Sequence, residues 1–158
     1  MPNSSCITQW KRRILSELQN DDEVLEALGT TEEEKEDLIY TRIYPHYYIP
    51  ETVTKVTTYI MVEIDIRSLS RTNVYSYPMI TFVILAHQDD MRLDLPNISA
   101  TRIDYLGELI DRKYNGTTGF GVGKLELKQN YAGNLNDTFR TRTLVFQGMD
   151  VNQNLCEI

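Results

Sequence analysis

The sequence predicts an α+β domain: a mainly antiparallel four-stranded sheet packed by one main helix and preceded by N-terminal helices. The strongest sign of the sheet is residues 56–67, where apolar and polar side chains alternate and place Ile60, Val62 and Ile64 on one face. A period of two is typical of a strand with one buried and one wetter face. The main helix begins at Pro96 or Asn97 and ends near residue 112, because apolar side chains recur there every three or four positions.

Composition places the chain among folded domains and counts against some functions. The chain is interpreted as a single domain of 158 residues, with 41% hydrophobic and 25% charged residues. The net charge of -7 argues against a dedicated nucleic-acid binder and against docking on anionic lipid. No apolar run is long enough to span a bilayer, and the first ten residues do not resemble a signal peptide. Cys6 and Cys156 are expected to be reduced thiols instead of a disulfide framework.

The first 43 residues are predicted to be helical. Residues 7–19 carry one apolar stripe, residues 22–28 form a short second helix closed by Gly29, and a third helix is expected over 32–39. Residues 44–50 contain three tyrosines and two prolines and form an extended connector. We expect this connector to pack across its own domain, with contact to a partner as the alternative.

The α+β core is predicted over residues 44–150, followed by a polar tail over 151–158. Residues 68–76 are a polar hairpin loop, and 77–87 is a nearly continuous apolar strand expected to be covered on both faces. A third strand over 125–131 should place Gln129 and Tyr131 on the same side as Leu125 and Leu127, and residues 139–149 form the fourth strand. The predicted core consists of Ile60, Val62, Ile64, Phe82, Ile84, Leu106 and Ile110.

Residue chemistry gives one weak catalytic motif. Glu126 and Lys128 match half of a metal-dependent nuclease site, which would need Glu63 or Asp65 as a further carboxylate to hold Mg²⁺. Alternating charges on the outer face of a strand are expected anyway. Neither histidine lies within metal-ligand spacing of a cysteine or another histidine. The prediction is therefore that the chain is not an enzyme and has no catalytic, cofactor-binding or metal-binding residues.

The layout of the elements resembles a known family. The resemblance is carried by Ile49-Pro50, the strand pair 56–67 and 79–87, the helix 98–112, and the strand 139–149. This arrangement is similar to the tail-terminator proteins of long-tailed bacteriophages, and more loosely to other neck proteins of the head-to-tail joint. The longer helical N-terminus departs from the family pattern, which leaves a stopper or adaptor position in the neck as an alternative.

The resemblance implies a structural virion protein without catalysis. It implies a ring, usually a homo-hexamer, that caps the tail tube protein and receives the head connector or stopper protein. DNA would pass through the lumen without specific binding, no membrane would be involved, and assembly would take place in the host cytoplasm. A negative net charge suits such a pore. A third class is a monomeric adaptor domain that binds one partner.

A candidate subunit interface follows from the wetter face of the first hairpin and from the last strand. It consists of Tyr59, Met61, Glu63, Asp65, Arg67, Arg71, Tyr75, Arg140 and Arg142. The apolar members would supply adaptable contact area, and the acidic pair would face the two arginines of the last strand in a neighbouring subunit. Replacing Met61 by Asp is expected to weaken the ring and leave the fold intact.

Overall fold

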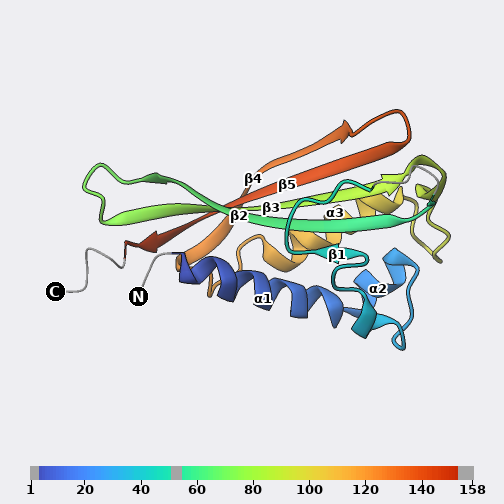
Figure 1. Cartoon of the computed structure of the whole chain (residues 1–158), viewed down its shortest axis with the longest axis horizontal. Helices are drawn as coiled ribbons and strands as arrows, with labels where there is room; N and C mark the ends of the chain where they lie inside the picture. Colours follow the sequence, from blue (N-terminus) through green and yellow to red (C-terminus); the bar gives the residue numbers. More distant parts are fainter. Residues whose placement is uncertain (1–3, 51–54, 153–158) are drawn as a thin grey trace.

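The computed structural model describes residues 4–50 and 55–152 and confirms the α+β class (Figure 1). Its elements are α1 (Ser5–Gln19), α2 (Asp22–Leu28), the 3-10 turn η1 (Lys35–Asp37), β1 (Ile43–Tyr44), β2 (Thr58–Leu69), β3 (Tyr75–His87), the 3-10 turn η2 (Gln88–Asp90), α3 (Arg102–Tyr114), β4 (Val122–Asn134) and β5 (Phe139–Val151). Cys156 and most of the expected tail lie outside the described residues.

The sheet has five strands in the order β1-β2-β3-β5-β4, so the prediction of four strands is wrong by one. The additional strand is β1, which pairs parallel to β2 through Ile43 opposite Ile60 and Tyr44 opposite Met61. All other neighbours are antiparallel, as predicted. A strand of two residues is too short to show a period in the sequence.

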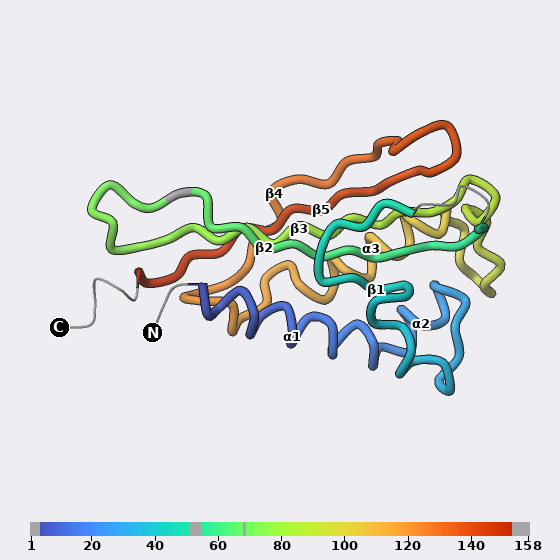
Figure 2. Tube along the Cα trace, viewed as in Figure 1, coloured from blue at the N-terminus to red at the C-terminus, as the bar shows by residue number. Residues whose placement is uncertain are grey.

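The helices and the sheet enclose one main core. Helices α1, α2 and α3 all cover the same face of the sheet (Figure 2). Helix α1 buries Trp10, Ile14 and Leu18 against this face. The seven predicted core residues are confirmed, since none of them is more than 3% exposed.

Local signals fix α2 as the sequence predicts. The Asp21 carboxylate accepts hydrogen bonds from the amides of Glu23 and Val24, at 3.0 and 3.2 Å, and caps the first turn. Gly29 ends the helix with a φ of 75°, a left-handed conformation that glycine adopts without strain.

Two helix predictions need correction. Residues 32–39 form only the short η1, because the carbonyl of Leu38 accepts hydrogen bonds from the amides of Thr41, Arg42 and Ile43 and so turns the chain into β1. Helix α3 begins at residue 102 and not at 96 or 97. Asn97 has a φ of 63°, which is incompatible with a helix start there, and Thr101 provides the cap.

The strand β4 departs from its predicted alternation. Leu125 is buried and Leu127 is partly buried on the helix side, but the register shifts between Leu127 and Gln129. Beyond this bulge Gln129 pairs with Val145 and Tyr131 pairs with Thr143, on the opposite face of the sheet. An extra residue in a strand moves every later side chain to the other face, so the prediction for Gln129 and Tyr131 is wrong.

Two hairpin ends point in opposite directions: the end of β2 and β3 extends past the helices, and the end of β4 and β5 stands apart from the rest of the molecule (Figure 1). We call residues 66–76 the β2–β3 arm and residues 129–140 the β4–β5 arm. The end of β5 supports the β2–β3 arm, since the Asn152 amide donates to the Val74 carbonyl at 2.7 Å. Every residue from 128 to 137 is exposed, so most of the β4–β5 arm is open on both faces.

Candidate functional site

The face of the sheet away from the helices, here called the outer face, is partly covered by the chain's own connector. Tyr44 and Tyr48 pack with Tyr59, Met61 and three further residues, Val83, Leu85 and Phe139, in a second apolar cluster. The rings of Tyr44 and Tyr48 stack with their centroids 4.2 Å apart. The predicted packing of the connector is therefore confirmed, while Tyr59 and Met61, each 4% exposed, do not offer the open surface that was expected.

Polar contacts fix the connector in place. Lys11 of α1 donates to the carbonyl of Pro45 at 2.7 Å and forms an ion pair with Glu63. The amide of Tyr48 donates to the sulfur of Met61 at 3.2 Å. Glu63 is thus engaged within its own chain, and Met61 is part of the fold, which contradicts the expectation that Met61→Asp would leave the fold intact.

Burial in the tyrosine cluster keeps two of its hydroxyl groups protonated at neutral pH. Burial, reinforced by Tyr48, raises the pKa of Tyr44 to about 12. Burial also raises the pKa of Tyr59. Both hydroxyls therefore remain protonated under physiological conditions.

Four predicted interface residues come together on or beside the β2–β3 arm. Asp65 forms an ion pair with Arg67 at 3.5 Å, and Arg71 and Tyr75 are exposed towards the tip. The same arm also exposes the apolar residues Leu69 and Val74, by 47% and 38%, which the sequence pattern does not mark as interface residues. Each is an apolar residue isolated in a polar stretch, and this feature of the sequence could have indicated an exposed contact residue.

The two arginines of the last strand lie elsewhere, at the β4–β5 arm. Arg142 donates from Nε to Asp104 at 2.7 Å and from a terminal nitrogen to Asn130 at 2.9 Å, on the helix side of the sheet. Arg140 donates to the carbonyls of Asn136 and Asp137 in the turn. Arg142 is therefore already paired within its subunit. The structure does not bring Glu63 and Asp65 near these arginines, so their proposed contact can occur only between subunits.

The β4–β5 arm also carries exposed apolar residues outside the predicted interface. Tyr131 is 52% exposed and Leu135 is 40% exposed. The bulge in β4 could not be recognised from the pattern, and this is why Tyr131 was placed on the wrong face. Tyr40, which precedes the connector, and Tyr47 and Ile49 within it are also exposed.

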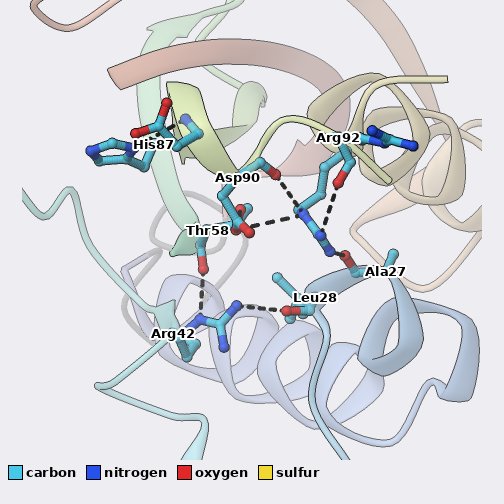
Figure 3. A network of polar contacts seen from close by, with 9 residues as sticks. Ala27, Leu28, Arg42, Thr58, His87, Asp90 and Arg92 are labelled. Carbon is cyan, nitrogen blue, oxygen red and sulfur yellow. Dashed lines mark hydrogen bonds and ion pairs between the residues drawn. The ribbon is translucent and has the colours of Figure 1, made fainter. Parts of the chain in front are cut away.

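A network of polar contacts joins the helical part to the sheet (Figure 3). Arg102 donates to the carbonyls of Ala27, Asp90 and Arg92, and it forms an ion pair of 3.5 Å with the Asp90 carboxylate. The same carboxylate accepts a hydrogen bond of 2.6 Å from the hydroxyl of Thr58. Positively charged side chains stabilise the free carbonyls at the C-terminal end of a helix. Arg102 does this for α2 through the carbonyl of Ala27.

Arg42 completes this network from the other side. It donates to the carbonyls of Thr58 at 2.7 Å and Leu28 at 2.8 Å (Figure 3). Burial lowers the pKa of Arg42, and the attraction of Asp90 opposes this effect. Because the nitrogens of both arginines bond to main-chain carbonyls, the network is suited to holding α2, β2 and the loop before α3 together and not to binding a ligand.

The geometry does not assemble the possible nuclease site. Glu126 and Lys128 pair with each other on β4, and the hydrogen bond from Lys128 lowers the pKa of Glu126. Glu63 and Asp65 lie on β2, with β3 and β5 in between. Three strand spacings separate the two pairs by about 14 Å, too far for both to hold one metal ion.

The described residues give no other site of this kind. Within residues 4–50 and 55–152, no group of three or more histidine, cysteine or acidic side chains is arranged to hold a metal ion. His87 is buried, and its Nδ1 accepts a hydrogen bond of 3.1 Å from the Asp89 amide, which caps η2. In the same part of the chain, no helix has the length and apolar character needed to cross a membrane.

Comparison with protein-family models relates the chain to a known family. The family model YomW matches residues 12–147, a stretch that runs from α1 into β5 and includes both arms. A search of curated proteins found no match.

Proposed function

The chain belongs to the YomW family, a phage-derived family of Bacillus prophage type, and on this premise we propose that it is a tail terminator. In this role it is a structural virion protein that forms a ring at the head-proximal end of a phage tail. The family match supports the phage origin. The arrangement of helices, hairpin, helix and hairpin, which resembles that of tail terminators, supports the specific position.

The observation that carries the proposal is the opposite placement of the two arms. Subunits that close into a ring use two different patches, each contacting the complementary patch on the next subunit. The β2–β3 arm exposes Leu69, Val74 and Tyr75, and the β4–β5 arm exposes Tyr131 and Leu135. Two separate apolar surfaces at opposite ends of one chain suit a head-to-tail contact better than a symmetric dimer.

The ring would join the tail tube protein on one side to the head connector or stopper protein on the other. DNA would pass through its lumen without specific binding, and 23 acidic against 16 basic residues would limit adhesion. The role requires no cofactor and no catalytic step. The exposed residues Tyr40, Tyr47 and Ile49, in or just before the connector, would remain available for the axial partners.

The test is the mass of the purified protein by light scattering, with and without tail tube protein, together with negative-stain images. We expect rings of about six subunits of 18.4 kDa each, either alone or once tail tube protein is added. A monomer under every condition would contradict the proposal and favour the adaptor class. Rings that bind the head connector but not the tail tube would assign the chain to another position in the neck.

A further inference from the structure

The outer edge of β2 is closed over most of its length. Alternate residues of an edge strand direct their amide and carbonyl groups away from the sheet, here Thr58, Ile60, Val62 and Ile64. Arg42 bonds to the carbonyl of Thr58, and the amide of Ile60 bonds to the carbonyl of Arg42. The amide of Ile64 donates a hydrogen bond of 3.1 Å to the side-chain carboxylate of Glu63. Natural proteins block strand edges in such ways to prevent unwanted pairing.

The first half of the β4 edge is closed as well. Leu125 exchanges hydrogen bonds with the loop after α3, through the amide of Gly116 and the carbonyl of Thr117. The amide of Leu127 donates to the side chain of Asn115 at 3.1 Å. Outward-facing main-chain groups are therefore blocked on both β2 and β4. A stretch of either strand in which these groups have no partner differs from the rest of its edge.

The β4 edge opens beyond the bulge. The hairpin is closed by a hydrogen bond from the Leu135 amide to the Phe139 carbonyl, so the alternation directs the main-chain groups of Asn130, Ala132 and Asn134 outward. Among residues 4–50 and 55–152, no main-chain or side-chain group bonds to these outward-facing groups. This segment is an unpaired template for another strand.

A second open edge lies at the opposite end of the molecule. Past Ile64, the outward-facing positions of β2 are Ile66 and, after a register shift, Leu69. Ser70 is turned inward, since its amide bonds to the carbonyl of Tyr75. The two open edges therefore coincide with the two arms.

We propose that the two arms pair with each other between copies of this chain, so that residues 66–69 of one subunit add as a strand to the edge formed by residues 130–134 of the next. Strand addition joins main-chain groups, while neighbouring side chains supply specificity. The strand order makes β2 and β4 antiparallel, so the added strand continues the antiparallel pattern. Exposed Leu69 and Val74 would meet exposed Tyr131 and Leu135.

This inference rests on the proposed ring and names the segments that close it. Because the two edges are different and lie at opposite ends, each copy would offer one donor and one acceptor edge, which is the requirement for a closed head-to-tail ring. A symmetric pairing of β4 with β4 is the competing arrangement.

The first test is Ala132→Pro, with Ala132→Ser as its matched control. Proline removes only the outward-facing amide of an exposed edge position, where it is tolerated. We expect ring formation by Ala132→Pro to require at least tenfold more protein than ring formation by Ala132→Ser, with unchanged circular dichroism and melting temperature. Rings of equal stability in both variants would overturn the inference and leave the tail-terminator proposal standing.

A cross-linking experiment tests the partners of each edge. Leu69→Cys and Ala132→Cys are placed singly in a Cys6→Ser, Cys156→Ser background and treated with a short bismaleimide. We expect no dimer from either variant alone, a dimer when the two are mixed, and a ladder of multimers from the double variant. A dimer from Ala132→Cys alone would show β4–β4 pairing and overturn the inference. An absence of all cross-links, with rings present, would also overturn it.

Discussion

Ile64 illustrates how the period-two pattern of β2 determines stability at a single position. Its side chain is 3% exposed and belongs to the main core. We expect Ile64→Ala to lower the free energy of unfolding by about 2–5 kcal/mol, because it removes buried methyl groups and leaves a cavity. Urea denaturation measures the change. Val74→Ala, at an exposed position of the β2–β3 arm, is the control and should change stability by less than about 0.5 kcal/mol.

Met61 lies on the same strand but faces the tyrosine cluster. Because it is buried and accepts a hydrogen bond from the Tyr48 amide, we expect Met61→Asp to destabilise the fold by several kcal/mol, of order 3 or more. Met61→Leu should cost less than about 1.5 kcal/mol. Thermal unfolding followed by circular dichroism distinguishes them. A folded Met61→Asp protein with the wild-type melting temperature would contradict the observed packing.

At the scale of elements, the cap of α2 links stability to pH. Burial alone would raise the pKa of Asp21, but hydrogen bonds from Lys113, Val24 and Glu23 outweigh burial and lower it below its ordinary value of 3.8. A depressed folded-state pKa stabilises the protein above the unfolded-state pKa, and this contribution is lost as pH falls through the folded-state pKa. The ionised carboxylate therefore stabilises the fold at neutral pH and loses this effect in acid.

Asp21→Asn tests this link, because asparagine keeps the capping oxygen and removes the charge. We expect the variant to be less stable than wild type by about 1 kcal/mol at pH 7, and the difference to shrink as pH falls below 4. Urea titrations at pH 7, 5 and 3 give the comparison. Lys113→Gln should remove the part of this contribution that comes from the Lys113–Asp21 ion pair. A gap that is as large at pH 3 as at pH 7 would show that Asp21 acts by some means other than its charge.

Elements with local signals were predicted well, and those that depend on distant contacts were not. The bounds of α2 follow from Asp21 and Gly29, which lie within the segment itself. The long apolar runs of β2 and β3 likewise determine their own geometry. In contrast, β1 exists because Ile43 and Tyr44 meet β2, and residues 32–39 turn around the carbonyl of Leu38. Neither contact has a signature in the sequence.

At the scale of the whole molecule, the fold brings only some of the predicted interface residues together. Alternation correctly separated the two faces of β2, but it could not show that the connector covers Tyr59 and Met61. Asp65, Arg67, Arg71 and Tyr75 do lie together on or beside the β2–β3 arm, because they adjoin one hairpin turn, and their role as an interface stays a prediction. The exposed Tyr131 was missed, because a single bulge in β4 changes its face.

The arrangement of charges across the sheet leads to a prediction about DNA. We expect the purified protein to leave duplex and single-stranded DNA intact in the presence of Mg²⁺, because Glu126 and the acidic residues of β2 are three strands apart. Incubation with labelled DNA and gel electrophoresis measures cleavage. Cleavage that disappears in Lys128→Ala but persists in Lys124→Ala would show instead that the nuclease motif on β4 is functional.

The two arms are connected through the centre of the sheet in a way that has a mechanical consequence. The β2–β3 arm leads into one end of β3, the β4–β5 arm leads into the opposite end of β5, and these two strands are neighbours joined by eleven residue pairs (Figure 1). Antiparallel hydrogen bonds lie perpendicular to the strands. Tension between the arms would therefore load all eleven pairs in shear at once, and would not peel them apart one by one. In the proposed ring, a pull from one neighbour would therefore reach the other along the direction of the strands, through the pairing of β3 with β5.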